Sequence, residues 1–125
     1  MGGVKLETLK AKRQYDFITI WSRRYYHMSS RNEGRSTNRS NAQGKDMMTK
    51  DEFLAWCKSK PQFIIFLVMW QEWYEDNFSL WSAPSVDRID SKKGYTVDNI
   101  QWLTFSDNCI KNNRDPQTMR GDFDE

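Results

Sequence analysis

Two β-prone segments, separated by a turn and followed by a short helical pattern, constrain the fold of this chain more than any other feature. Ser85 to Ile89 follows a proline, which disfavours helix, and carries β-branched residues that favour a strand. Tyr95 to Leu103 is β-prone as well, with apolar and polar residues alternating near its end. Ser91 to Gly94 is typical of a turn, so we expect a hairpin, followed by a short helix that Thr104 or Ser106 caps.

The part of the chain before the hairpin predicts helices. From Lys5 to about Met28, large apolar side chains recur at spacings of three and four, as on one face of a helix. Thr49 and Glu52 form a capping-box signature for a second, short helix. Pro61 suits the first turn of a third helix, whose Phe63 to Tyr74 is apolar almost all round, so we expect that helix at the buried centre of the protein.

The 125 residues, 38% of them hydrophobic, suffice for one compact domain. We therefore predict an α+β protein with a helical N-terminal part and a C-terminal hairpin-plus-helix module. The expected segments are a basic and aromatic helix over 1–30, a flexible basic loop over 31–48, the core of the domain over 49–113 and a disordered acidic tail over 114–125.

The cysteines and the apolar segments exclude several classes of protein. Cys57 and Cys109 are isolated, so we expect two free buried thiols with neither a structural zinc nor a disulfide framework. The longest apolar run, Phe63 to Trp70, is far shorter than the roughly 20 residues of a membrane span. We therefore expect a soluble, cytoplasmic protein that is not bound to a membrane.

The net charge of +2 conceals an uneven distribution. Residues 1–45 hold ten Lys or Arg against three acidic residues, and residues 46–125 hold nine against fourteen. A basic first third suits a polyanion such as DNA, although an ordinary solvated helix face would look the same. The candidate DNA-binding residues are Arg23, Arg24, Arg31, Arg35, Arg39, Lys92, Lys93 and Lys111.

The segment from Pro84 to Asn113 contains Pro-Ser-Val-Asp-Arg-Ile-Asp, then Gly-Tyr-Thr-Val-Asp-Asn-Ile-Gln-Trp, then Asn-Cys-Ile-Lys. This series of motifs resembles the HNH, or ββα-metal, family as it occurs in small phage proteins and homing-endonuclease-like proteins. The resemblance covers about thirty residues. It implies that the hairpin and the following helix form a ββα-metal module.

The resemblance also implies roles for individual residues. Asp87 matches the metal-binding aspartate of the family, and Asn108 falls where the second metal ligand lies on the final helix. Asn99 matches the asparagine that braces the loop between the strands, and Lys111 is placed to touch a substrate phosphate. One hard divalent cation, Mg²⁺ or Mn²⁺, would bind such oxygen ligands and stabilise charge on a phosphodiester.

One position departs from the family pattern, because Arg88 stands where the family has the histidine that acts as general base. Arginine stays protonated and has no acceptor atom. The base could instead be Asp90, which alternation along a strand puts on the same side as Arg88, or the single histidine, His27. A third alternative is a module that has lost catalysis and in which Arg88 grips a phosphate.

The sequence thus predicts a metal-dependent DNA endonuclease of the HNH type, encoded by a phage and acting in the cytoplasm of an infected cell. Its predicted catalytic residues are Asp87, Arg88, Asp90 and Asn99.

The alternative is a catalytically inactive, HNH-like protein that binds DNA or serves as a regulator or inhibitor. Double-stranded DNA is the expected partner, and a homodimer or a host or phage protein partner stays open. If these residues have only structural roles, Asp87 to Asp90 form an ion-pair cluster that closes a turn, and Asn99 and Asn108 stabilise a turn and a helix cap.

Overall fold

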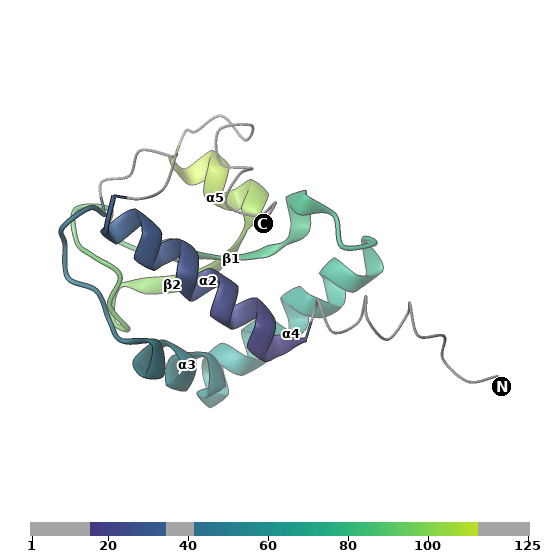
Figure 1. Cartoon of the computed structure of the whole chain (residues 1–125). Coiled ribbons are helices and arrows are strands. Elements are labelled where there is room, and N and C mark those ends of the chain that lie inside the picture. The colour runs from purple at the N-terminus through teal and green to yellow at the C-terminus, as the bar shows by residue number, and fades with distance from the viewer. Residues whose placement is uncertain (1–15, 35–41, 113–125) are drawn as a thin grey trace, which may run out of the picture.

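The computed structural model describes residues 16–34 and 42–112 and shows an α+β fold (Figure 1). Its elements are, in order, α2 Phe17–Asn32, α3 Lys50–Lys58, α4 Lys60–Glu75, the 3-10 helix η1 Leu80–Ser82, β1 Pro84–Arg88, β2 Ile100–Thr104 and α5 Phe105–Asn112. The predicted fold class is therefore confirmed. Parts of three predictions lie outside the described residues, namely the helix before residue 16, Arg35 and Arg39 in the loop, and the tail over 114–125.

The side chains of the hairpin alternate between its two faces. Strands β1 and β2 pair antiparallel, with Val86 opposite Trp102 and Asp87 opposite Gln101. Because successive side chains of a strand point to opposite faces, Val86 and Trp102 enter the main apolar core while Asp87 and Gln101 face the other way. Helices α4 and α5 both pack against the two strands, and Figure 1 shows α5 above the hairpin and α3 and α4 below it.

The helices begin where the local sequence supplies caps. The Thr49 side chain accepts a hydrogen bond from the Glu52 backbone N–H, and the Glu52 carboxylate accepts one from the Thr49 backbone N–H, so the predicted capping box is confirmed. The Asp16 side chain caps α2 by accepting from the backbone N–H of Thr19 at 2.9 Å. At the end of β2, the Thr104 hydroxyl accepts from the backbone N–H of Asp107, and α5 begins directly after the strand. This direct junction holds α5 close to β1.

Aromatic side chains build the core between α2, α4 and the hairpin. The ring of Phe66 lies 5.0 Å from that of Trp102 and 5.4 Å from that of Trp21, measured between centroids. Phe53 of α3 joins the same cluster with no exposed surface. Cys57 and Cys109 are both buried free thiols, as the sequence predicted. A small chain thus buries considerable apolar area with few residues.

Helix α4 is not the buried centre that its composition predicted. Only Phe66 and Trp73 of this helix are buried, and they face the hairpin and the turn after the helix. The opposite face carries exposed apolar side chains, among them Ile64 and Val68 at 50% and 56% exposure. A helix with apolar residues on every face is usually buried on all sides, but α4 lies at the edge of the fold.

Both ends of the segment 31–48, predicted as a flexible loop, belong to the described fold. Arg31 and Asn32 are part of α2, and residues 42–48 lie in the second described range. Ala42 and Met48 are buried, and the backbone N–H of Met48 donates to the carbonyl of Tyr95 at 2.8 Å. Residues 42–48 are therefore held against the segment that leads into β2.

Within 16–34 and 42–112, no helix has the combined length and apolar character that a bilayer span requires.

Candidate metal and DNA site

Asp87 lies at the centre of the candidate site. It is the fourth residue of β1, 3% exposed, and its side chain is on the hairpin face that α5 covers. Its Oδ2 atom accepts hydrogen bonds from the Lys111 ammonium at 2.7 Å and from the Gln101 amide at 3.0 Å. Gln101 is its cross-strand partner, and Lys111 comes from the last turn of α5. The hairpin register and the helix together fix this carboxylate.

The Lys111 ammonium lies near three oxygen atoms. Besides Asp87, it donates to the backbone carbonyl of Arg88 at 2.7 Å and approaches that of Ile89 at 3.4 Å. One carboxylate and two carbonyls are also ligand types that hard divalent cations prefer. A cation supplied by the chain itself therefore occupies an oxygen-lined position at the end of β1.

Asn108, the second predicted metal ligand, lies beside Asp87. It is 5% exposed, and its amide nitrogen donates to the Ser85 hydroxyl at 3.2 Å. The Nδ2 atom of Asn112 lies 2.5 Å from Asn108 Oδ1 and 3.4 Å from Asp87 Oδ1. Because one amide nitrogen contacts both oxygens, the structure brings the two predicted metal ligands together.

The residues of this cluster suit a hard divalent cation. Its acceptors are all oxygen atoms, from Asp87, Asn108 and backbone carbonyls, with no thiol or imidazole among them. The described ranges contain no group of three His, Cys, Asp or Glu side chains placed to hold a metal ion, so neutral oxygens would have to supplement the one carboxylate. Binding would require Lys111 and the Asn112 amide to turn away. The Lys111 side chain is 36% exposed, which leaves it room to do so.

Arg88 is the last residue of β1, and its side chain contacts the loop that follows the strand. It is 7% exposed, and its guanidinium donates to the backbone carbonyls of Ser91 and Lys93, each at 3.0 Å. The guanidinium carbon also lies 5.3 Å from the centre of the Tyr95 ring. Strand alternation puts Arg88 on the face opposite Asp87. Its side-chain contacts are therefore with the loop and not with Asp87 or Asn108.

Asn99 and Asp90 close the same loop. The Asn99 side chain accepts from the Asp90 backbone N–H at 2.9 Å and donates to the carbonyls of Asp90 and Gly94 at 3.0 and 2.8 Å. The Asp90 carboxylate accepts from the backbone N–H of Lys92 at 2.9 Å. Asn99 thus braces the loop between the strands. Both side chains make turn contacts, and neither contacts Asp87 or Asn108.

Two of the basic residues expected at the surface are buried, each with 8% exposure. Arg24 donates through Nε to the carbonyl of Pro84 at 2.8 Å, and burial, followed by the nearby charges of Arg23 and Arg31, lowers the pKa of Arg24 to about 10. Arg31 donates to the Tyr95 hydroxyl at 3.1 Å. These arginines join α2 to the hairpin and have little surface left for a phosphate.

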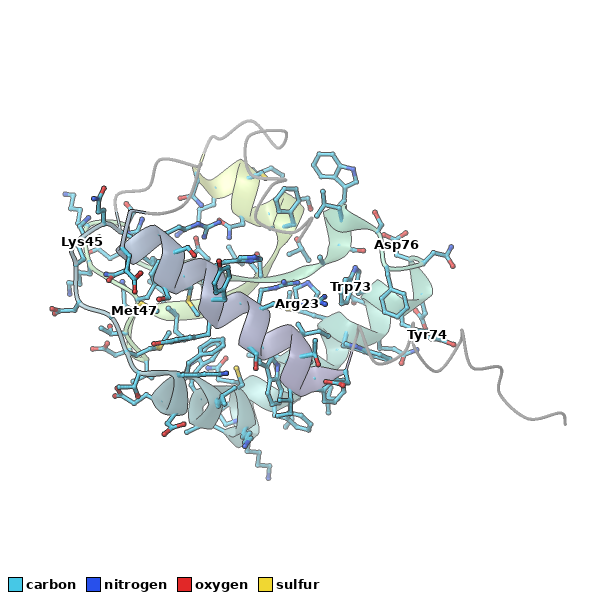
Figure 2. The ribbon with its side chains drawn as sticks, viewed as in Figure 1. Arg23, Lys45, Met47, Trp73, Tyr74 and Asp76 are labelled. Carbon is cyan, nitrogen blue, oxygen red and sulfur yellow. The ribbon has the colours of Figure 1, made fainter. Side chains whose placement is uncertain are left out.

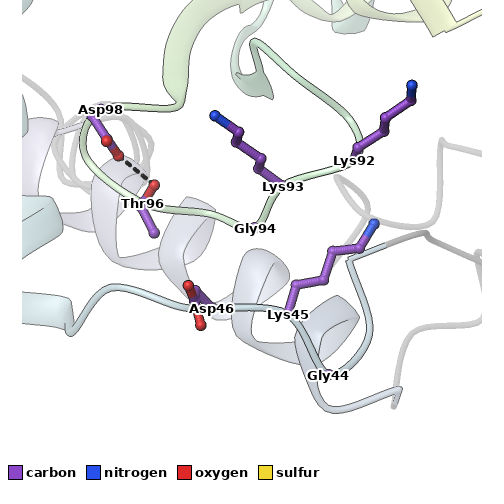
Figure 3. A pocket seen from close by; sticks show the side chains of 8 residues that line it. All are labelled: Gly44, Lys45, Asp46, Lys92, Lys93, Gly94, Thr96 and Asp98. Carbon is purple, nitrogen blue, oxygen red and sulfur yellow. Dashed lines mark hydrogen bonds between the residues drawn. The ribbon is translucent and has the colours of Figure 1, made fainter.

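The lysines of the loop between the strands remain accessible. Lys92 and Lys93 are exposed and line an open hollow of about 550 Å³ together with Lys45, whose ammonium donates to the Ser91 carbonyl at 3.2 Å (Figure 3). Asp46 and Asp98 lie on the same rim, and the hydrogen bond from the Thr96 hydroxyl lowers the pKa of Asp98. Lys45 lies at the opposite end of the molecule from Tyr74 and Asp76 (Figure 2).

The remaining sequence candidates are Arg23 and His27 on α2. Arg23 is partly exposed, and His27 is 7% exposed with its ring 5.8 Å from that of Tyr26. The sequence interpretation missed Gln101, Asn112 and Ser85. Gln101 could have been found from the hairpin register, since it faces Asp87 across the strands. Asn112 could have been found from its place one helical turn after Asn108.

No protein-family model, curated protein sequence or solved structure matches this chain.

Proposed function

We propose that this protein is a metal-dependent DNA endonuclease of the HNH type that hydrolyses phosphodiester bonds at the Asp87 cluster. The observation that carries the proposal is the convergence of Asp87 Oδ1 and Asn108 Oδ1 on the same Asn112 nitrogen. Their positions on β1 and α5 match those of the metal ligands in the family that the sequence resembles. The oxygen donor set suits Mg²⁺ or Mn²⁺.

Each residue of the cluster would have its own role in binding the cation and the DNA. Asp87 and Asn108 would hold the cation, and Gln101 keeps the Asp87 carboxylate oriented from the neighbouring strand. When bound, the cation supplies charge stabilisation for the phosphodiester under attack. Lys111, which contacts Asp87 in this structure, would then be the cation of the cluster that pairs with a substrate phosphate. The exposed Lys92 and Lys93 add affinity for the DNA backbone that does not depend on sequence.

The second candidate function is DNA binding without cleavage, and one observation favours it. The ion pair at 2.7 Å between Lys111 and Asp87 neutralises the carboxylate with the chain's own charge. Arg88, at the position of the family's histidine base, offers no acceptor for a proton and is held by loop carbonyls. Such a protein would retain the hairpin-plus-helix fold without cleaving DNA and would bind DNA through its exposed lysines.

Nicking of supercoiled plasmid in the presence of Mg²⁺ or Mn²⁺ tests both functions. We expect the natural chain to nick, and Asp87→Asn and Asn108→Ala to lose nicking while still binding DNA in a gel-shift assay. Asp107→Asn is the matched control, because Asp107 is an exposed carboxylate of α5 outside the cluster. DNA binding without nicking by the natural chain under every metal would overturn the endonuclease and support the second candidate. Absence of both binding and nicking would overturn both.

A further inference from the structure

The outer face of α4 carries the densest group of exposed apolar side chains among the described residues. Ile64, Ile65, Leu67 and Val68 are 50%, 44%, 37% and 56% exposed and lie within five consecutive positions of one helix. Of the other large exposed apolar residues, Tyr74 lies near the end of α4, and the rest, such as Ile110 and Trp81, lie on other parts of the fold. Soluble proteins seldom leave such a contiguous patch uncovered unless it serves an interaction.

Charged residues flank this patch in a symmetric arrangement. Lys60, Ile64, Val68 and Glu72 follow one another at intervals of four residues, so they form a single ridge along α4. Lys60 and Glu72 are both exposed. With a rise of about 1.5 Å per residue, each lies about 9 Å along the helix from the midpoint between Ile64 and Val68. The patch is positive at one end and negative at the other.

From this arrangement we propose that the α4 face, defined as Lys60, Ile64, Ile65, Leu67, Val68 and Glu72, binds a second copy of this chain. A two-fold axis through the midpoint makes the two α4 helices antiparallel. It then places Lys60 of each copy opposite Glu72 of the other, with the apolar side chains between. The ends of the ridge are complementary only in this orientation, because a parallel pair would bring like charges together.

The proposal does not depend on the proposed nuclease function. The α4 face is on the side of the hairpin away from α5 and Asp87, so a dimer formed here leaves the Asp87 cluster uncovered (Figure 1). One helix face per copy gives a small interface, and small interfaces form complexes that dissociate on dilution. We therefore expect a monomer at low micromolar concentration and a dimer at higher concentration.

Sedimentation velocity of the full chain over a range of concentrations measures this association. The mass should rise from 15.0 kDa toward twice that value. Val68→Glu, which buries a charge in the centre of the interface, should abolish the rise. Lys60→Glu and Glu72→Lys should each weaken dimerisation by roughly tenfold, because both ion pairs of the dimer become repulsive. Lys58→Glu, an exposed charge reversal at the end of α3, should leave dimerisation unchanged.

Mixing the two charge-reversal variants gives the sharpest test. In an equimolar mixture of Lys60→Glu and Glu72→Lys, the heterodimer regains two attractive pairs, so association should return to the level of the natural chain. Circular dichroism should show that every variant is folded, as expected for substitutions of exposed residues. A natural chain that remains monomeric, or association that Val68→Glu does not reduce, would overturn the proposal, as would a mixture that associates no better than either variant alone.

Discussion

The Nζ atom of Lys111 lies 2.7 Å from Oδ2 of Asp87, so the carboxylate proposed as a metal ligand is already paired with a cation of the same chain. Asp87 is 3% exposed and lies between the hairpin and α5, where an unpaired charge would be costly. The lysine therefore stabilises the metal-free protein. It also competes with any divalent ion for the same oxygen atoms.

Replacing Lys111 by methionine should tighten Mn²⁺ binding. The substitution removes a positive charge from the oxygen-lined position and keeps the apolar part of the side chain, so affinity should rise by about tenfold or more. Titration followed by Mn²⁺ electron paramagnetic resonance measures this change. Lys58→Met, at an exposed position on α3, should bind Mn²⁺ as the natural chain does. An unchanged or weaker affinity in Lys111→Met would show that the lysine does not occupy the position of the metal.

Replacing Asn99 by alanine should destabilise the protein by about 3 kcal/mol. The side chain makes three hydrogen bonds to the backbone of Asp90 and Gly94 and is 5% exposed, and each such bond contributes about 1 kcal/mol. Urea unfolding measures the loss. Asn99→Asp should cost nearly as much near neutral pH, because a carboxylate accepts from Asp90 but cannot donate to the two carbonyls. A loss below about 1 kcal/mol in both variants would contradict the bracing role.

The elements that sequence reasoning predicted correctly are those with local signals. The Thr49 and Glu52 capping box, Thr104 at the start of α5 and the hairpin around Asp87 all depend on residues close together in the chain. Asp87 and Asn108 are placed in one module by the resemblance to the HNH family, whose motifs also lie within about thirty residues of the sequence.

The features that the sequence did not indicate depend on contacts between distant residues. Arg24 and Arg31 are buried because their acceptors, the Pro84 carbonyl and the Tyr95 hydroxyl, lie 60 and 64 residues further along the chain. Charged side chains are normally exposed, so no local pattern indicates their burial. The apolar residues of α4 predict a buried helix. The sequence does not indicate which face is covered, because that depends on where the hairpin lies.

Gly94→Ala should disrupt the packing of the segment before β2 onto residues 44–48. A Cβ atom on Gly94 would lie 1.9 Å from the backbone oxygen of Asp46, and backbone cannot move aside as a flexible side chain can. We expect a loss of about 3 kcal/mol or more in urea unfolding. Gly44→Ala is the matched control, since its Cβ would meet nothing within 4 Å and only its φ of +75° is unfavourable, at about 1 kcal/mol. Equal effects of the two substitutions would show that the close approach at Gly94 is not the cause.

Replacing both Lys92 and Lys93 by glutamine should weaken DNA binding and reduce its dependence on salt. Both side chains are exposed at the tip of the loop between the strands (Figure 3). Each lysine that contacts a phosphate contributes about one unit to the slope of log K against log salt concentration, so the slope should fall by about two. Fluorescence anisotropy at several salt concentrations measures it. The double variant Lys50→Gln and Lys58→Gln carries the same charge change on α3, and an equal fall there would exclude a specific role for the loop.

Cys57 should make the protein sensitive to alkali. Burial raises the pKa of its thiol well above the ordinary value of 9.0. The unfolded chain therefore releases this proton as pH rises through about 9, whereas the folded chain retains it, and the unfolded state is favoured. The stability linked to the thiol is fully present below pH 9.0 and is lost above it, by on the order of 1 kcal/mol between pH 8 and pH 10.

Urea unfolding at both pH values, in the natural chain and in Cys57→Ala, measures this loss. The variant should start from a lower stability, because the substitution leaves space in the core, but its stability should fall less with pH. Equal falls in the two chains would show that other groups cause the alkaline sensitivity.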